Sequence, residues 1–182
     1  SVTTGTSNTL IGGQAGDAIT TGGSNVALGT LALSANTTAS ENTAVGYQAA
    51  YSTTTGVSNS ALGWRSFYTN TTGIQNVALG ERALHLNTTG SYNVSVGMDS
   101  LKANTTGDYN VAVGSLAGDA NTTGQYNTVV GGNAFTTNKT CTGNYSQGTS
   151  ALQNNTTANY NTAVGLDAMQ LNTTGTQNVA LG

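Results

Sequence analysis

The sequence predicts an all-β protein, a parallel β-solenoid with 17-residue coils, in which about eleven coils form a single array over residues 1–182. Three observations predict it. A pentad of the form N-V-A-L-G, as at Asn25–Gly29, recurs every 17 residues without insertion or deletion. Apolar residues keep fixed positions in every repeat, which a disordered polar linker would not need. Glycine, asparagine and threonine are abundant between these apolar positions, and proline is absent from the sequence.

The first and last residues of the pentad recur in every repeat. Stacked coils lie about 4.8 Å apart, so each recurring residue is expected to form a column, with asparagine amides bonding from coil to coil. The asparagines are Asn8, Asn25, Asn42, Asn59, Asn76, Asn93, Asn110, Asn127, Asn144, Asn161 and Asn178. The glycines, which permit a sharp bend, are Gly12, Gly29, Gly46, Gly63, Gly80, Gly97, Gly114, Gly131, Gly148, Gly165 and Gly182.

Each repeat is predicted to form a strand, a bend, a second strand and a turn. The second and fourth residues of the pentad are apolar, and this period of two indicates a short strand. A second apolar patch, such as Ala32–Leu33, predicts the second strand. The following N-T-T-G motif supplies turn chemistry. Ala39 and Ala158 replace its glycine, so this turn is not expected to require positive φ. β-Branched residues and glycines recur too closely for a helix.

The small third residue of the pentad is predicted to face outward. If the apolar second and fourth residues point into the coil, the third forms a flat outer stripe that a second chain can approach closely. Burial within one short coil is small against the backbone entropy that it loses, so we expect a homo-oligomer, with a trimer as the preferred assembly. The stripe comprises Ala27, Ala44, Ala61, Ala78, Ser95, Ala112, Ala163 and Ala180.

The pentads carry a resemblance to a known family. N-V-A-[LV]-G-x-x-A resembles the head repeats of YadA-like trimeric autotransporter adhesins. The form N-T-A-V-G-Y-Q-A-x-x-x-x-T-T-G, at residues 42–56, is similar to repeats of phage tail-fibre and related bacterial surface proteins, many of which end in an endosialidase-type chaperone domain. The resemblance implies a left-handed β-roll and a side-by-side trimer in an extracellular, cell-surface or virion fibre. The period departs from it, with 17 residues here against a typical 14 in the adhesin heads.

Charge and residue types argue against several functions. Only 6% of residues are charged, and four basic residues cannot form a nucleic-acid surface of any size. No apolar stretch reaches membrane-spanning length. His85 is the sole histidine and Cys141 the sole cysteine, so one chain holds neither a histidine-based triad nor a zinc cluster. The acidic residues keep no common position in the repeat. We therefore expect no enzyme, no metal and no cofactor.

Three sets of exposed polar or aromatic residues leave alternatives open. Tyr92, Tyr109, Tyr126 and Tyr160 precede the pentad asparagine and predict either a stiffening stack or a strip that contacts glycans or proteins. The N-T-T motifs supply turn chemistry and are also glycosylation sequons. Their threonines raise the further alternative of ice binding, although adjacent Thr-Thr pairs in a turn differ from a T-x-T strand.

Three repeats are irregular. Gly16 and Gly118 replace the large residue of the second apolar patch. The Lys139–Gly148 segment has Gln147 where other repeats have Leu or Val. We interpret these as weak points or bulges, with a binding site near Lys139 as an alternative.

The sequence predicts a segment of a longer fibre protein that acts as a rigid spacer and attachment element, in a phage tail fibre or in the shaft or head of a bacterial adhesin. Its partners would be further copies of the chain and a cell-surface glycan or receptor. The alternative is a ligand-binding solenoid that contacts glycans or ice through exposed Thr, Asn and Tyr columns.

Overall fold

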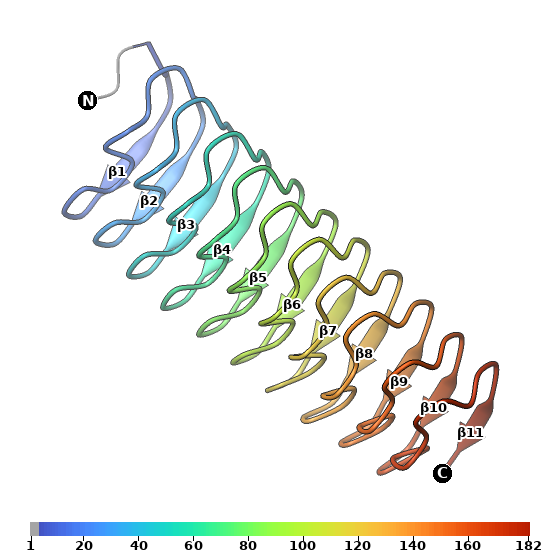
Figure 1. Cartoon of the computed structure of the whole chain (residues 1–182). Helices are drawn as coiled ribbons and strands as arrows, with labels where there is room; N and C mark the ends of the chain where they lie inside the picture. The colour runs from blue at the N-terminus through green and yellow to red at the C-terminus, as the bar shows by residue number, and fades with distance from the viewer. Residues whose placement is uncertain (1–3) are drawn as a thin grey trace.

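The computed structural model describes residues 4–182 as an elongated stack of coils (Figure 1). The first three residues of the predicted array lie outside the described residues. Each coil contributes one strand of three residues: β1 (Thr9–Ile11), β2 (Val26–Leu28), β3 (Thr43–Val45), β4 (Ser60–Leu62), β5 (Val77–Leu79), β6 (Val94–Val96), β7 (Val111–Val113), β8 (Thr128–Val130), β9 (Tyr145–Gln147), β10 (Thr162–Val164) and β11 (Val179–Leu181).

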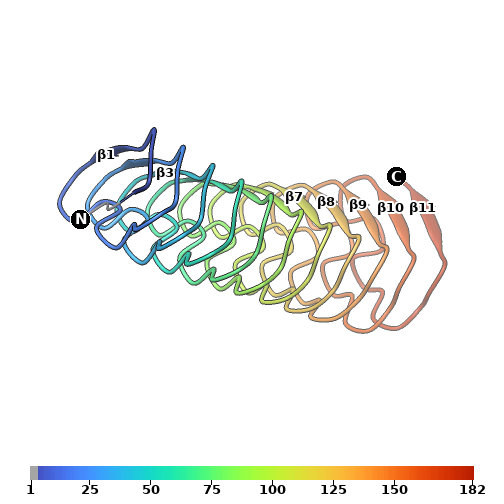
Figure 2. The same cartoon turned by 90° about the horizontal axis from the view of Figure 1, so that it is seen from above.

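The strands form one 11-stranded parallel sheet in chain order. In the middle of the stack Val77 pairs with Val94 and Ala78 with Ser95, a register of one repeat. The same register holds at the first pair, β1–β2, and at the last, β10–β11. Seen from above, the coils follow one another along a single axis (Figure 2). The predicted parallel β-solenoid with 17-residue coils is confirmed.

The predicted second strand is wrong, because the second apolar patch is a turn. Its backbone bonds in both directions along the stack: Arg82 N donates to Trp64 O of the preceding coil at 3.0 Å, and Leu84 N to Ser100 O of the following coil at 3.1 Å. Arg82 and Leu84 have φ of 53° and 50°. This left-handed conformation, rare for residues with a side chain, turns alternate N–H groups toward opposite neighbours.

The orientation predicted for the pentad is also wrong. The third residue lies inside the coil: Ala27, Ala44, Ala61, Ala78, Ser95, Ala112 and Ala163 are at most 1% exposed, and Ala180 of β11 is partly exposed. The second and fourth residues face outward instead, as in β2 with Val26 38% and Leu28 44% exposed. Side chains alternate along a strand, so the buried pentad asparagine fixes the third residue on the inner side.

The interior therefore consists mainly of small side chains with one larger residue. In the coil that begins at Asn76, Ala78 and Ala83 surround Leu84, and all three are fully buried. Phe67, Leu101, Phe135 and Leu152 take the place of Leu84 in other coils. Because protein interiors are packed as densely as organic crystals, these side chains fill the narrow interior of the coil.

Neighbouring side chains fill the space that the two glycines of the irregular coils leave in the interior. A Cβ on Gly16 would meet Leu10 Cδ2 and Ile19 Cδ1 at 2.8 Å. One on Gly118 would lie 3.2 Å from Leu101 Cδ2 of the preceding coil and 4.0 Å from Val129 Cγ2. Leu10 and Val129 occupy the position that alanine takes in other coils. The register is unchanged at these coils, so the predicted bulges are wrong.

We expect Val129→Ala and Gly118→Leu to be destabilising singly and to compensate each other when combined. Val129→Ala leaves a cavity that costs about 2 kcal/mol, and Gly118→Leu alone overpacks the coil by about 1–3 kcal/mol. The double variant recreates the Ala78–Leu84 arrangement, in which leucine already accepts a φ of 50°. Urea unfolding of the three variants measures the coupling. Simple addition of the two losses would contradict this account.

Candidate functional site

The pentad asparagines form a column through the stack that is buried from Asn25 to Asn161. The Oδ1 of each accepts the backbone N–H of the asparagine one coil later at 2.9–3.1 Å. It also accepts that residue's side-chain Nδ2 at 3.1–3.4 Å. Within its own coil, Asn76 Nδ2 donates to Gly90 O at 3.0 Å. Each amide thus joins two coils and closes one, in the interior where an unpaired polar group is costly.

The asparagines of the N-T-T motifs form a second, mostly buried column. Its amide bonds run from Asn70 to Asn121 and from Asn155 to Asn172, and they are interrupted at Thr53 and Asn138. Asn104 Nδ2 donates to Asn87 Oδ1 at 2.9 Å and to Gly107 O at 3.0 Å. Asn36, Asn70, Asn87, Asn104, Asn121 and Asn155 are at most 1% exposed. These sequon nitrogens point into the coil, so the folded chain cannot present them to a glycosyltransferase.

The pentad glycines are stacked so closely that a side chain has no room. Gly80 has a φ of 136°, and a Cβ there would lie 2.6 Å from Gly97 O. The glycines of the N-T-T-G turn lack positive φ. They are crowded by the next coil, since a Cβ on Gly56 would lie 2.3 Å from Gly73 O. The expectation that this turn does not require positive φ agrees with the structure.

The two threonines of each turn differ. The first donates its hydroxyl to the backbone of the next coil, as Thr88 Oγ1 does to Thr105 O at 3.1 Å. The second is exposed, from Thr21 to Thr174. In such a pair, therefore, the first hydroxyl already donates within the stack and the second faces solvent.

Three of the four predicted tyrosines form a stack. The ring centroids of Tyr92 and Tyr109 lie 4.7 Å apart and those of Tyr109 and Tyr126 lie 5.1 Å apart, each pair within 4° of parallel. Partial desolvation, with the neighbouring phenols and Asp108, raises the pKa of Tyr109. Tyr160 lies instead over Gly143, whose added Cβ would be 2.6 Å from its ring. Tyr109 has a ring on each face, and Tyr92, Tyr109 and Tyr126 remain 40%, 46% and 56% exposed.

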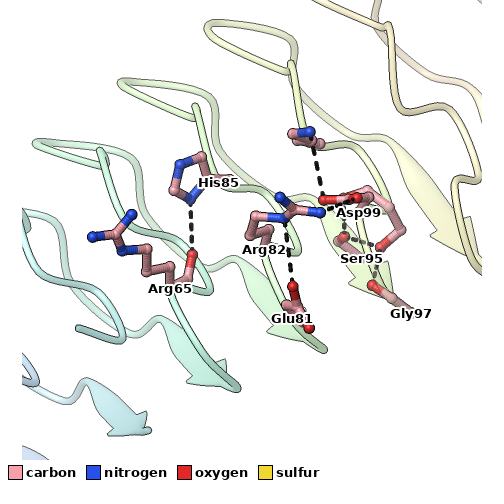
Figure 3. A network of polar contacts seen from close by, with 9 residues as sticks. Arg65, Glu81, Arg82, His85, Ser95, Gly97 and Asp99 are labelled. Atoms are coloured by element: carbon pink, nitrogen blue, oxygen red, sulfur yellow. Dashed lines mark hydrogen bonds and ion pairs between the residues drawn. The ribbon is translucent and has the colours of Figure 1, made fainter. Parts of the chain in front are cut away.

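Charged side chains gather on a few central coils (Figure 3). Arg82 Nη2 lies 2.6 Å from Asp99 Oδ2, and Lys102 Nζ lies 3.8 Å from Asp99 Oδ1. Glu81 lies 3.8 Å from Arg82 Nε. Burial raises the pKa of the Asp119 carboxyl, while Lys102 acts to lower it. Ser95 and Ser100 share a short hydrogen bond inside the same coil. This grouping is absent from the repeat consensus, so periodicity could not reveal it.

His85 and Cys141 are both held by backbone carbonyls. His85 Nδ1 lies 3.0 Å from Arg65 O, and its ring stacks on Tyr68 with centroids 5.2 Å apart. Cys141 is 1% exposed, its Sγ donates to Thr156 O, and burial raises the pKa of the thiol. Over residues 4–182 no three His, Cys, Asp or Glu side chains lie together as metal ligands would.

The Lys139 coil keeps the sheet intact. Gln147 is the outward-facing fourth residue of its pentad and the last residue of β9, where its side chain is exposed and accepts a hydrogen bond from Tyr145 at 2.9 Å. A polar residue there needs no buried partner, which explains why the substitution leaves the register unchanged.

The chain matches no known protein-family model, no curated protein and no solved structure. The resemblance to adhesin and tail-fibre repeats, with the handedness and trimer that it implies, therefore stays a prediction. In the portion of the chain that the structure describes, none of the backbone forms a helix capable of crossing a bilayer.

Proposed function

We propose that this chain is a non-enzymatic structural segment of an extracellular fibre, either a phage tail fibre or a bacterial surface adhesin, and that it acts as a rigid spacer and attachment element. The observation that carries this proposal is the unbroken register of all eleven strands. The two asparagine columns add side-chain bonds between successive coils. Such a stack resists bending, and this suits it to hold another part of a fibre away from a surface.

The outer face of the sheet supports self-association. The second and fourth pentad residues of β1–β11 carry no charged side chain and are mostly Val, Leu, Ile and Thr. Leu62 is 49% and Ile11 58% exposed. Eleven strands about 4.8 Å apart give a face roughly 50 Å long and about 10 Å wide. Two such faces of roughly 500 Å² would bury about 1,000 Å² together, the lower end of the range for a specific protein–protein contact. The repeat offers the same face on every copy of the chain.

This face replaces the alanine stripe as the surface through which copies of the chain would associate. We expect the wild-type chain to have a mass in solution that is a multiple of 18.2 kDa, with three copies as the preferred assembly. Leu62→Glu places a charge on the face and should reduce the mass to that of one chain. Light scattering measures both masses.

A matched control is Thr72→Glu, which adds the same charge to an exposed turn away from the sheet. It should leave the assembly intact. A wild-type chain that is folded and monomeric at micromolar concentration would refute self-association. Equal effects of the two glutamates would refute the choice of face.

The exposed tyrosines favour a second candidate, a solenoid that binds glycans directly. Tyr126 is 56% and Tyr160 60% exposed. A glycan array and an ice-affinity assay with the isolated chain distinguish this binding module from the spacer. An inert rod supports the spacer, and binding that requires the Tyr or Thr columns supports the module.

A further inference from the structure

One side of the central coils carries an arginine that no carboxylate neutralises. Arg65 Nε donates to Gln48 Oε1 at 2.7 Å. Its Nη atoms have no hydrogen-bond or carboxylate partner within the described part of the chain, whereas Arg82 and Lys102 both lie near Asp99. In Figure 3 the Arg65 guanidinium is turned away from Arg82 and Asp99. A guanidinium with free Nη donors matches the two oxygens of a carboxylate.

Aromatic rings flank this guanidinium. Its Cζ lies 4.8 Å from the centroid of Trp64 and 5.4 Å from that of Tyr68. Tyr68 in turn stacks between Tyr51 and His85, which holds it in place. The attraction between the cation and the rings orders the arginine while its outer donors stay in solvent.

Trp64 is the sole tryptophan of the chain and is 41% exposed. Among residues 4–182 no aromatic ring stacks on it, in contrast to the Tyr92–Tyr109–Tyr126 stack. Tyr47, one coil earlier at the same place in the repeat, is 43% exposed. Glu81, one coil later at the same place, offers carboxylate oxygens that can accept hydrogen bonds from hydroxyl groups. An apolar ring beside hydrogen-bonding groups suits a sugar, which has both C–H faces and hydroxyls.

We propose that Trp64 and Arg65 form a surface site for an acidic saccharide, in which Arg65 binds the sugar carboxylate and the sugar ring packs on Trp64. The site uses none of the repeated Thr, Asn or Tyr columns. It does not depend on the proposed fibre role, because a spacer and a binding solenoid could both carry it. The shared chemistry is a sugar carboxylate, which occurs in both sialic acids and uronic acids.

The intrinsic fluorescence of Trp64 reports binding without a label. We expect 3′-sialyllactose or tetragalacturonate to change it with a dissociation constant on the order of 1 mM, as suits an open surface with few contacts. Lactose, which lacks the carboxylate, should leave it unchanged. The two acidic probes show whether sialic or uronic acid is preferred.

Two variants test the assigned roles. Arg65→Gln introduces the residue that Gln14 and Gln48 already provide at this place in the repeat, with similar positive φ. Trp64→Thr introduces the residue found there at Thr30 and Thr149. Each should weaken binding of the acidic probe by about tenfold or more, measured by calorimetry, as expected for loss of a charge-assisted bond or an aromatic contact.

Lys139→Thr is the matched control. It removes one positive charge four coils away and restores the threonine of the N-T-T motif. It should bind the acidic probes as the wild type does. No fluorescence or calorimetric response to either acidic probe at about 10 mM would overturn the site. Equal binding of lactose, or unchanged binding by Arg65→Gln, would overturn the role of the carboxylate.

Discussion

Replacing Asn76 by alanine is expected to lower the free energy of unfolding by about 3–5 kcal/mol. The side chain is 1% exposed and donates to Asn59 Oδ1 and Gly90 O, while its Oδ1 accepts from Asn93 N–H. Alanine leaves the Asn93 N–H buried without an acceptor, which costs about 1–3 kcal/mol. It also removes bonds of about 0.5–1.5 kcal/mol each to Asn59 Oδ1 and Gly90 O, which keep Asn76 N–H and Asn87 Nδ2 as donors. Urea unfolding followed by circular dichroism measures the loss.

Val77→Thr is the control for this variant. It changes the adjacent residue, which faces outward, to the threonine that β3, β8 and β10 carry at the same position. We expect a change of less than about 0.5 kcal/mol. Similar losses in the two variants would show that the asparagine column contributes no more than an exposed strand position.

Replacing Gly80 by alanine should be as damaging, by a steric mechanism. Its φ of 136° is a conformation that residues with a side chain rarely adopt, and the added Cβ would lie 2.6 Å from Gly97 O. The backbone cannot retreat, because Gly80 N donates to Leu62 O of the preceding coil at 2.8 Å. We expect a loss of at least about 3 kcal/mol, combining backbone strain with the separation of two coils.

Gly90→Ala tests whether this loss is specific to the pentad. Gly90 is also crowded, with an added Cβ 2.6 Å from Gly107 O, but it has no positive φ. Ala39 and Ala158 already occupy its place in other coils. A loss of about 1 kcal/mol is therefore expected. Thermal unfolding compares the two variants. A larger loss of stability in Gly90→Ala than in Gly80→Ala would contradict this account.

Periodicity predicted the solenoid, the coil length and the stacking, because a 17-residue repeat without insertions permits one register. It did not reveal which way the strand faces. Hydrophobicity alone favours Val26 and Leu28 inside, yet the interior is too narrow for two large residues on every strand and takes Ala27 with Leu33 instead. The buried asparagine beside Val26 was the available signal, since alternation carries its inward orientation to Ala27.

The sequence does not indicate that the second apolar patch is a turn, for another reason. Leu33 and Leu84 are unfavourable residues for positive φ, and no local propensity indicates that conformation. Hydrogen bonds to both neighbouring coils impose it. The central charged cluster and the Trp64–Arg65 pair were missed because they depart from the repeat, and a search for a consensus discards such departures. Tyr51, Tyr68 and His85, each 17 residues apart, could have been found.

In both asparagine columns, every side-chain amide bond that joins two coils runs in one sense, from a coil to the one before it. The stack therefore has a direction. Its amide oxygens face the C-terminal end, and its amide hydrogens face the N-terminal end. Another array of the same repeats could prolong these columns head to tail, whereas a head-to-head junction would set oxygen against oxygen. Any fibre that extends this motif must keep a single polarity along its length.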